Sequence, residues 1–412
     1  MNLFKKSPPA PKKEISRERI WRDMYENGGR LNIAASISAE AARLVTLEMS
    51  SGIYGSKRAE VLDGAYQKVI GKARSFCELA CALGGVMLKP YIADGRIETA
   101  FVPADSFEVT ATAPDGTICG VRFFERLELD GKRYIKCEEH LLSQESYIIT
   151  NRAYLDSLGV KREVPLSEVS VWSSLEERVV IEKVKSGLFS YFGMPFVVTE
   201  DIASPLGAPI FARAVSLIED ANRQYERLLW EFESGERALY IDETAVRRGR
   251  RGEAQLPDKR LYRMLATGND ELFNDWSPEI RDEAIINGLE RILQRIEFNC
   301  GLAYGTLSDP QAVEKTAEEI RASKQRSYAT VTELQTALKN ALIGWVKAAD
   351  ILCDVYSLAP EGEYSIDFAF DDSIVADRTA EFDERMRLLD KGVITADEMK
   401  AWYFGKGAKV NE

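Results

Sequence analysis

A single histidine limits the acid–base chemistry that this chain can perform. The 412-residue sequence contains only His140, inside the segment CEEHLL. A histidine-based triad, a histidine general base or most transition-metal sites would have to be built around that one side chain. We therefore interpret His140 as a structural or surface residue and expect no histidine-based catalysis.

Neighbouring carboxylates are the next candidates for chemistry. Adjacent acids occur at Glu138-Glu139, Glu176-Glu177 and Asp371-Asp372, and carboxylate oxygens are ligands that magnesium accepts. None of these pairs stands near a phosphate-gripping loop, and the sequence contains no GxxxxGK[ST], no GxGxxG after a strand and no GxSxG. We interpret the pairs as solvated charge and expect no enzyme activity, no metal site and no cofactor.

The cysteines do not form a metal-binding pattern. Cys77 and Cys81 lie four residues apart on one predicted helix face, but no second cysteine pair and no nearby histidine completes a site. They are predicted to be small buried residues. The N-terminal segment MNLFKKSPPAPKKE lacks the apolar core of a signal peptide, so we expect a cytosolic chain with reduced thiols.

Four arginines around one glycine form a concentrated basic cluster. Arg247, Arg248, Arg250 and Arg251 keep their charge at every physiological pH and could contact phosphate or an acidic protein. The surrounding segment has the pattern of a strand, a basic turn and a second strand. Its tip is either a solvated hairpin or a contact surface. Because it lies at the far end of two predicted helices, we favour a docking role.

The net charge argues against general binding to nucleic acid or anionic membrane. Asp and Glu number 66 against 54 Lys and Arg, a formal net charge of -12. Any DNA contact must then be local or weak. No run of about 18 apolar residues exists, so we expect no membrane span.

The first half of the chain changes from helical to strand periodicity. Residues 1–16 carry Lys5, Lys6, Lys12 and Lys13 among three prolines and are predicted to be a mobile basic arm. Arg58 to Leu83 has apolar residues at helical spacing, ended by Gly84-Gly85. Five short runs then predict an antiparallel sheet of about 65 residues, with hairpin turns at Asp94-Gly95, Asp115-Gly116 and Asp130-Gly131.

The second half is read as helices separated by short strand-bearing segments. The pattern predicts a helix from Pro209 to Gly235 and another beginning at Ser277-Pro278, with a small strand module between them. Shorter elements are expected as strands at Tyr147–Thr150, Val179–Ile181, Phe196–Val198 and Tyr364–Phe370, and as helices at Thr379–Leu389 and Ala396–Trp402.

A small loop leads into a predicted helix that is too long for one core. Gly301, Gly305 and Pro310 interrupt any helix, and Thr316 with Glu319 forms a predicted capping box. From there to about Tyr356 nothing stops the helix, which would run roughly 60 Å. It must bend or pack against neighbouring subunits.

Three stretches of sequence resemble the portal proteins of tailed bacteriophages. They are GGVMLKPYIADGRIETAFVPADSF at 84–107, GAPIFARAVSLIEDANRQYERLLWEFESGERALYID at 207–242, and GLAYGTLSDPQAVEKTAEEIRASKQRSYATVTELQTAL at 301–338. The sequence is closely similar to the portal proteins of siphophages that infect Gram-positive bacteria. That group includes proteins often labelled minor capsid protein. The likeness covers most of the chain, and the short part after Asp371 implies a small crown or none.

The resemblance implies an α+β portal fold divided into named parts. The subunits of that family form a ring, usually of twelve, at one capsid vertex, through which the genome enters and leaves. The implied parts are a basic arm (1–16), a wing (17–204), stem helix 1 (205–235), a clip (236–276), stem helix 2 (277–299), a tunnel loop (300–315), a long kinked helix with a wing strand (316–378), and short crown helices (379–412).

The resemblance also implies where DNA and partner proteins would meet the ring. Twelve copies at -12 each carry -144 formal charges, so the lumen can repel phosphate and let DNA slide. Lys315 is the nearest cation to the loop. The predicted DNA-tunnel residues are Tyr304, Gly305, Thr306, Leu307, Ser308, Asp309, Gln311 and Lys315, and the predicted clip-docking residues are Arg247, Arg248, Arg250 and Arg251.

The implied partners are other phage proteins and the DNA itself. They are the terminase large subunit, the head–tail adaptor, the major capsid and scaffolding proteins, and double-stranded DNA bound without sequence specificity; the implied location is the virion, and the host cytoplasm during assembly. Two other hypotheses remain: an oligomeric adaptor or minor head scaffold without a DNA channel, and a magnesium-dependent nuclease or phosphoryl transferase. The second needs clustered carboxylates with spaced Lys or His, which the sequence lacks.

Overall fold

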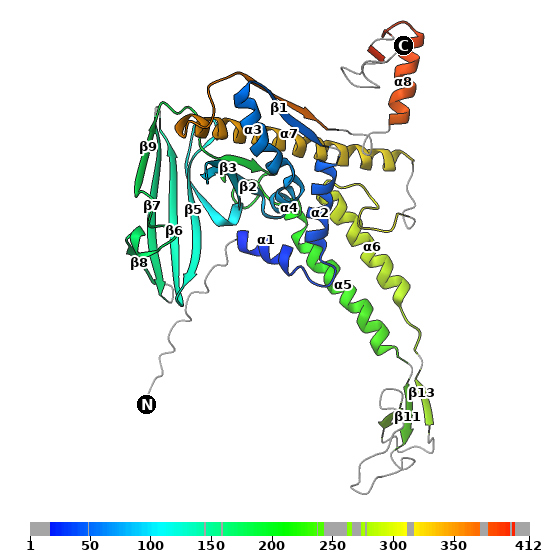
Figure 1. Ribbon diagram of the computed structural model, residues 1–412. Helices are drawn as coiled ribbons and strands as arrows, with labels where there is room; N and C mark the ends of the chain where they lie inside the picture. Colours follow the sequence, from blue (N-terminus) through cyan, green and yellow to red (C-terminus); the bar gives the residue numbers. More distant parts are fainter. Residues whose placement is uncertain are drawn as a thin grey trace, which may run out of the picture.

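The computed structural model describes most of the chain as a broad body from which two long helices project. The described residues are 17–47, 49–143, 146–157, 160–236, 238–242, 262–265, 273–276, 278–310, 317–370, 378–395 and 398–399. Figure 1 shows the body at one end of the helix pair and a small sheet at the other. The basic arm, 1–16, lies outside the described residues, as does all but two residues of the helix expected at Ala396–Trp402.

Four helices, α1 to α4, form the first part of the body. They are α1 Arg17–Glu26, α2 Ile33–Thr46, α3 Lys57–Ile70 and α4 Ala73–Leu83. The single helix expected over Arg58–Leu83 is wrong, because it breaks after Ile70. Gly71 ends α3 with its N–H donated to the Gln67 carbonyl, and the chain starts again at Ala73. The periodic stripe passes through the break, so spacing alone did not reveal it.

Two sheets, rather than the one expected, follow these helices. A three-stranded sheet has the order β10-β2-β3, and a larger sheet has the order β4-β5-β6-β7-β8 with β9 beside β7. All pairings within these two sheets are antiparallel. The bounds are β2 Gly85–Ala93, β3 Arg96–Pro103, β4 Phe107–Thr112, β5 Ile118–Leu129, β6 Lys132–Leu142, β7 Ser146–Ser157, β8 Val160–Val164, β9 Arg178–Glu182 and β10 Ser190–Gly193.

The predicted hairpin turns are confirmed. Asp94 and Gly95 both have positive φ, at 49° and 71°, and join the paired residues Ala93 and Arg96. Asp130 and Gly131 do the same between β5 and β6. Two consecutive positive φ values are what a tight hairpin needs, and the Asp-Gly pair tolerates them. A wider turn containing Gly116 connects β4 and β5.

The strands expected between 147 and 204 are only partly right. The strand predicted as Tyr147–Thr150 is β7, which continues to Ser157, and the one predicted as Val179–Ile181 is β9. Phe196–Val198 is not a strand. The carbonyl of Phe196 accepts from the Ala208 N–H, and the neighbouring strand is β10 instead.

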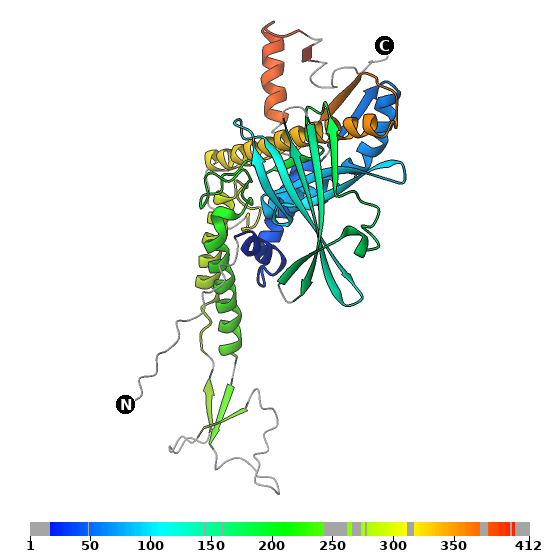
Figure 2. The same ribbon diagram turned by 90° about the vertical axis from the view of Figure 1, so that its left-hand side faces the viewer.

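The projecting pair consists of α5 Val215–Ser234 and α6 Asp282–Asn299. Both are shorter than expected at their first turns. Ahead of α5 the backbone is docked on the body, with the Ile210 N–H donated to the Cys81 carbonyl, and a 3-10 turn precedes Val215. Ahead of α6, the Arg281 N–H is donated to the Glu231 carboxylate at 3.0 Å. Figure 2 shows the two helices side by side from a second direction.

A three-stranded sheet lies at the far end of the helix pair. It has the order β12-β11-β13, with β11 Ala238–Asp242, β12 Tyr262–Leu265 and β13 Phe273–Trp276. β11 pairs antiparallel with β13 but parallel with β12. The strand–basic turn–strand hairpin is therefore wrong, because hairpin strands are antiparallel. Arg247, Arg248, Arg250 and Arg251 lie outside the described residues.

The longest element is α7, Ala317–Val355, an unbroken helix of 39 residues. This confirms the expected long helix, and the kink implied by the resemblance stays a prediction. α7 crosses the body, where Leu338, Leu342, Trp345 and Val346 are fully buried in the main core. The expected strand at Tyr364–Phe370 is β14 Tyr364–Ala369, paired antiparallel with β1 Ser50–Gly55, and α8 Arg378–Asp390 follows.

Candidate functional site: the loop between α6 and α7

The loop after α6 leaves the helix through a motif that glycine makes available. Gly301 has φ 69°, and its N–H is donated to the Phe298 carbonyl while the Leu302 N–H reaches back to the Glu297 carbonyl at 2.9 Å. This pair of bonds is the Schellman ending. A Cβ on Gly301 would lie 2.4 Å from Thr330 Oγ1 on α7, so a larger residue would also push the loop from its neighbouring helix.

One buried carboxylate organises the described half of the loop. Glu297, with 0% of its surface exposed, directs Oε1 at three backbone N–H groups: Gly305 at 3.1 Å, Leu307 at 2.7 Å and Ser308 at 2.9 Å. Ser308 Oγ also donates to this carboxylate. Convergent donors of this kind satisfy a buried charge that would otherwise be costly. The loop from Cys300 to Pro310 is therefore tied to α6.

The other side of the loop is held by α7. The Tyr304 N–H is donated to Ser323 Oγ at 2.6 Å, and Ser323 is only 2% exposed. The Arg326 guanidinium lies 4.5 Å from the centre of the Phe298 ring and 5.1 Å from that of Tyr304. Both rings are within the range of a cation–π contact. The same arginine thus touches α6, the loop and its own helix.

The structure brings six of the predicted loop residues together, but not as a uniformly exposed tip. Ser308 is 3% exposed, and its hydroxyl, expected to offer an uncharged contact, is used on Glu297. Leu307 packs against the main core, and Thr306 donates to the Ala303 carbonyl at 2.6 Å. Gln311 and Lys315 lie outside the described residues. Any DNA contact by Tyr304, Gly305, Thr306, Leu307 or Asp309 remains a prediction.

Three residues that hold the loop, Glu297, Ser323 and Arg326, were not predicted from the sequence. Glu297 falls four residues after Leu293, where the apolar stripe of α6 continues and a charged side chain needs partners. A glutamate on this apolar stripe was the feature of the sequence that could have indicated a buried carboxylate with partners. Ser323 and Arg326 carry no comparable signal, since both residue types are ordinary on a helix surface.

An ion pair joins α5 and α6 at the end of the helix pair that leads to the β11–β13 sheet. Arg281 Nη2 lies 2.8 Å from Glu231 Oε2, and Arg281 Nε and its backbone N–H both donate to Oε1 at 3.0 Å. These hydrogen bonds from Arg281 hold the pKa of Glu231 below its usual value. The arrangement fixes the last turn of α5 against the start of α6.

The residues examined for catalysis have structural surroundings. His140 is buried, with Nδ1 2.8 Å from the Tyr147 hydroxyl and Nε2 2.6 Å from Glu138 Oε1. Burial lowers the pKa of His140 below 6.5, although Glu138 acts in the opposite direction. Lys89 Nζ lies 2.6 Å from the same Glu138 oxygen. The imidazole therefore joins a hydrogen-bond and ion-pair network that links β2, β6 and β7.

Cys77, Cys81 and Glu139 also have structural surroundings, whereas Asp371 and Asp372 lie outside the described residues. Cys77 and Cys81 are buried, and burial raises the pKa of Cys81 to about 12. Glu139 pairs with Arg122 at 3.1 Å. Within the described residues, no group of three or more His, Cys, Asp or Glu side chains could hold a metal ion. No described helix combines the length and apolar character needed to cross a membrane.

The sequence matches no known family model. It also matches no curated protein. Among solved structures, the fold is similar to a chain described as "Neck of native GTA particle computed with C12 symmetry", with a TM-score of 0.43, 12% sequence identity and 92% of each chain covered. A likeness at this level is distant and assigns neither a family nor an activity to this chain.

Proposed function

We propose that this protein is a portal subunit that assembles into a ring-shaped channel at one vertex of a phage capsid. The arrangement that supports the proposal is a broad body, a two-helix stem, a small sheet at the stem's far end and a long helix that leads from the loop across the body (Figure 1). These parts follow the order that the sequence resemblance implies.

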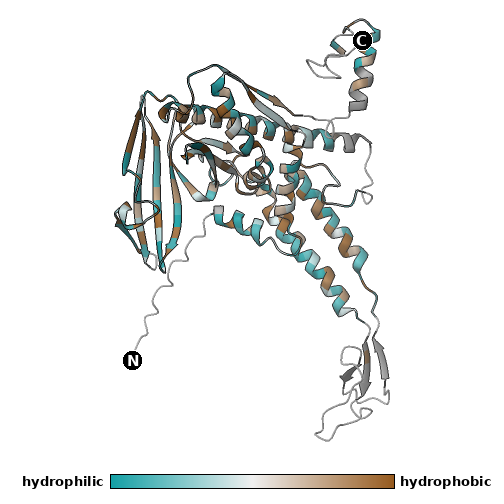
Figure 3. Ribbon diagram, in the orientation of Figure 1, coloured by the Kyte–Doolittle hydropathy of each residue, from teal (hydrophilic) through white to brown (hydrophobic). Residues whose placement is uncertain are grey.

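The observation that carries the proposal is the apolar surface of the stem. Trp230 is 65% exposed, and Phe232, Ile280 and Ile286 are 42%, 43% and 40% exposed. Brown apolar bands recur along both helices in Figure 3. A pair of helices projecting from its body cannot bury such side chains within one chain, whereas copies standing side by side in a ring can.

The finer parts of the proposal concern partners and DNA. The clip would dock the terminase large subunit during packaging and the head–tail adaptor afterwards, and the wing would contact capsid and scaffolding proteins. DNA would pass the loop after α6 without sequence-specific contact, entering during packaging and leaving during ejection. The acidic net charge of -12 per chain supports sliding rather than tight binding.

Light scattering followed by negative-stain imaging tests the ring. A closed ring of twelve 46.2 kDa chains, about 550 kDa with a central hole, is the expected result. A stable compact dimer would contradict the channel and favour the adaptor or scaffold alternative.

Matched variants test the carrying observation. Trp230→Asp and Ile286→Asp should each reduce the ring fraction, because a charge on a subunit contact loses its hydration. Val160→Asp is the control, since Val160 on β8 is 71% exposed and lies away from the stem. An equal loss of rings in all three variants, or no loss in any of them, would contradict a subunit contact through α5 and α6.

A further inference from the structure

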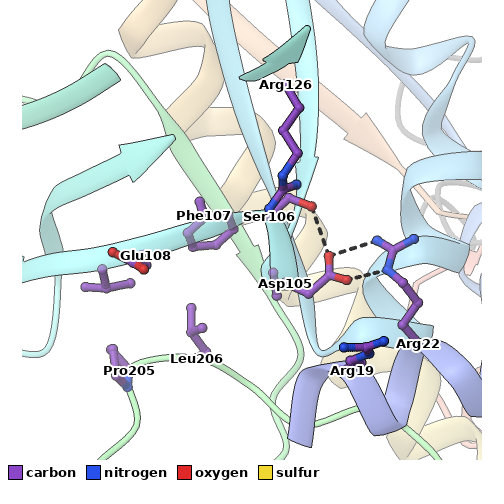
Figure 4. Close-up of a pocket in the computed structure, with 11 residues that line it drawn as sticks. Arg19, Arg22, Asp105, Ser106, Phe107, Glu108, Arg126, Pro205 and Leu206 are labelled. Carbon is purple, nitrogen blue, oxygen red and sulfur yellow. Dashed lines mark hydrogen bonds and ion pairs between the residues drawn. The ribbon is translucent and has the colours of Figure 1, made fainter. Parts of the chain in front are cut away.

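A groove of about 880 Å³ lies beside β4, an outermost strand of the larger sheet. One wall is the consecutive stretch Ala104 to Val109, which includes the first half of β4. Arg19 and Arg22 of α1 and the Pro205-Leu206 segment form the other side, and Arg126 reaches in from β5. Figure 4 shows these side chains around one space.

The edge of β4 that faces away from β5 has no strand partner in the described part of the chain. β4 pairs only with β5, through Phe107↔Phe123, Glu108↔Arg122 and the residues that follow. In an edge strand, alternate residues direct their N–H and C=O groups outward, where another extended chain can pair with them. The groove therefore offers backbone donors and acceptors in a row.

Some of the charged groups around this edge have ion-pair partners among the described residues, and others do not. Arg22 makes a two-pronged contact with Asp105, one bond of which is 2.8 Å, and it holds the pKa of Asp105 below its usual value despite burial. Glu108 pairs with Arg122 at 3.1 Å. Arg19 and Arg126 are both exposed, and neither has an ion-pair partner among the residues that the structure describes. Two guanidinium groups thus remain available on opposite sides of the groove.

We propose that this groove binds an extended acidic segment of another protein, which adds as a strand to β4. Its backbone would pair with the free edge, and its carboxylates would meet Arg19 and Arg126. The groove follows the consecutive residues Ala104 to Val109, which span at most roughly 20 Å, and pairing would begin on the regular first half of β4, Phe107 to Val109. Strand addition gives affinity through the backbone, while the arginines select the charge.

The charges around the groove favour another protein over this chain itself as its occupant. Residues 1–16, which precede α1, carry Lys5, Lys6, Lys12 and Lys13 and have the wrong charge for the groove. Exposed apolar side chains suited to a permanent contact between copies occur on α5 and just ahead of and within α6, whereas several of the residues that line this groove are charged. Charged rims suit partners that associate and separate. The inference stands without the proposed channel.

The direct test is fluorescence anisotropy on the full-length protein with a labelled peptide, acetyl-Val-Glu-Val-Glu-Val-Asp-amide. Two matched probes accompany it: one with lysine in place of each acid, and one with alternate backbone nitrogens methylated. We expect the acidic probe to bind saturably and the other two to bind at least roughly tenfold more weakly. Equal binding of the acidic and methylated probes would overturn strand addition.

Charge reversal tests the two arginines. The double variant Arg19→Glu and Arg126→Glu should weaken binding of the acidic probe roughly tenfold or more. The control Arg133→Glu, which changes an exposed arginine on β6, should leave binding of the probe unchanged. Equal effects in both proteins would overturn the assignment. A probe that binds only after the oligomer is diluted into single chains would show that a second copy fills the groove, which would overturn the choice of another protein.

Discussion

Replacing Glu297 tests whether one carboxylate positions the loop after α6. Glu297→Ala would leave the N–H groups of Gly305, Leu307 and Ser308 without their acceptor in a site where Glu297 and Ser308 are buried. Each unpaired buried donor costs about 1–3 kcal/mol, and these costs are not additive, so we expect the closed loop to lose about 3 kcal/mol. Glu297→Gln keeps the shape and one acceptor oxygen. It should therefore lose only about 1–2 kcal/mol.

Amide hydrogen exchange on the intact protein measures this loss residue by residue. Because about 1.4 kcal/mol corresponds to a tenfold change in an opening equilibrium, exchange at the three amides should rise roughly a hundredfold in the alanine variant and roughly tenfold in the glutamine variant. The control is Glu290→Ala. Among the described residues, its carboxylate accepts only from the exposed Asp309 N–H at 2.9 Å, so the change should stay at Asp309.

Two outcomes would refute the reasoning about Glu297. The first is exchange at Gly305, Leu307 and Ser308 within about twofold of the original protein in the alanine variant. The second is an equal rise in the Glu290→Ala control, which would mean that the loop opens independently of this carboxylate. If the alanine variant unfolds throughout, the graded effect in Glu297→Gln still decides the matter.

Three further predictions concern other parts of the chain. Burial lowers the pKa of His140, and partner charges hold the pKa of Glu138 far below 4.5. The unfolded chain therefore binds more protons in acid than the folded chain, so the free energy of unfolding should fall as the pH drops below about 6.5. In denaturant titrations, His140→Gln should flatten this pH dependence between pH 7 and 5.5. An equal slope in both proteins would contradict this. Arg58→Ala should lower the free energy of unfolding by about 2 kcal/mol. The loss is smaller than for a fully buried pair because the two aspartate partners of Arg58 are partly exposed. The control Lys68→Ala, at an exposed ion pair, should cause no measurable change in the free energy of unfolding. Deleting Tyr304 to Asp309, combined with Glu297→Gln so that no unpaired buried charge remains, should leave rings intact in electron micrographs but impair DNA packaging or retention. Normal packaging would contradict the assignment of this loop to the DNA channel.

The parts of the fold that could be predicted are those fixed by neighbouring residues. The Asp94-Gly95 and Asp130-Gly131 turns follow from the backbone angles that these residue types tolerate, and both hairpins are present. The long helix α7 also follows from local pattern, because no proline or glycine breaks it before Gly344, and Gly344 lies where α7 packs closely against Ser190 of β10. Local chemistry is sufficient for such elements.

The parts that could not be predicted depend on contacts across the chain. The start of α5 is delayed because Ile210 and Ala208 bond to segments elsewhere in the body. The parallel pairing of β11 with β12 is a choice between partners that strand propensity does not distinguish. For the candidate site, glycine spacing indicated a loop. The acceptor that organises it, Glu297, becomes visible only when the fold closes around it.

The long helix α7 has a mechanical consequence. Ser323 and Arg326 hold the loop near one end, while Asp354, about 46 Å farther along the axis, holds the buried Arg58 of α3 near the other. A hydrogen-bonded helix resists compression along its axis far better than a loop does. A push on the loop would therefore travel along this helix toward α3, past β2 and β10, against which α7 packs.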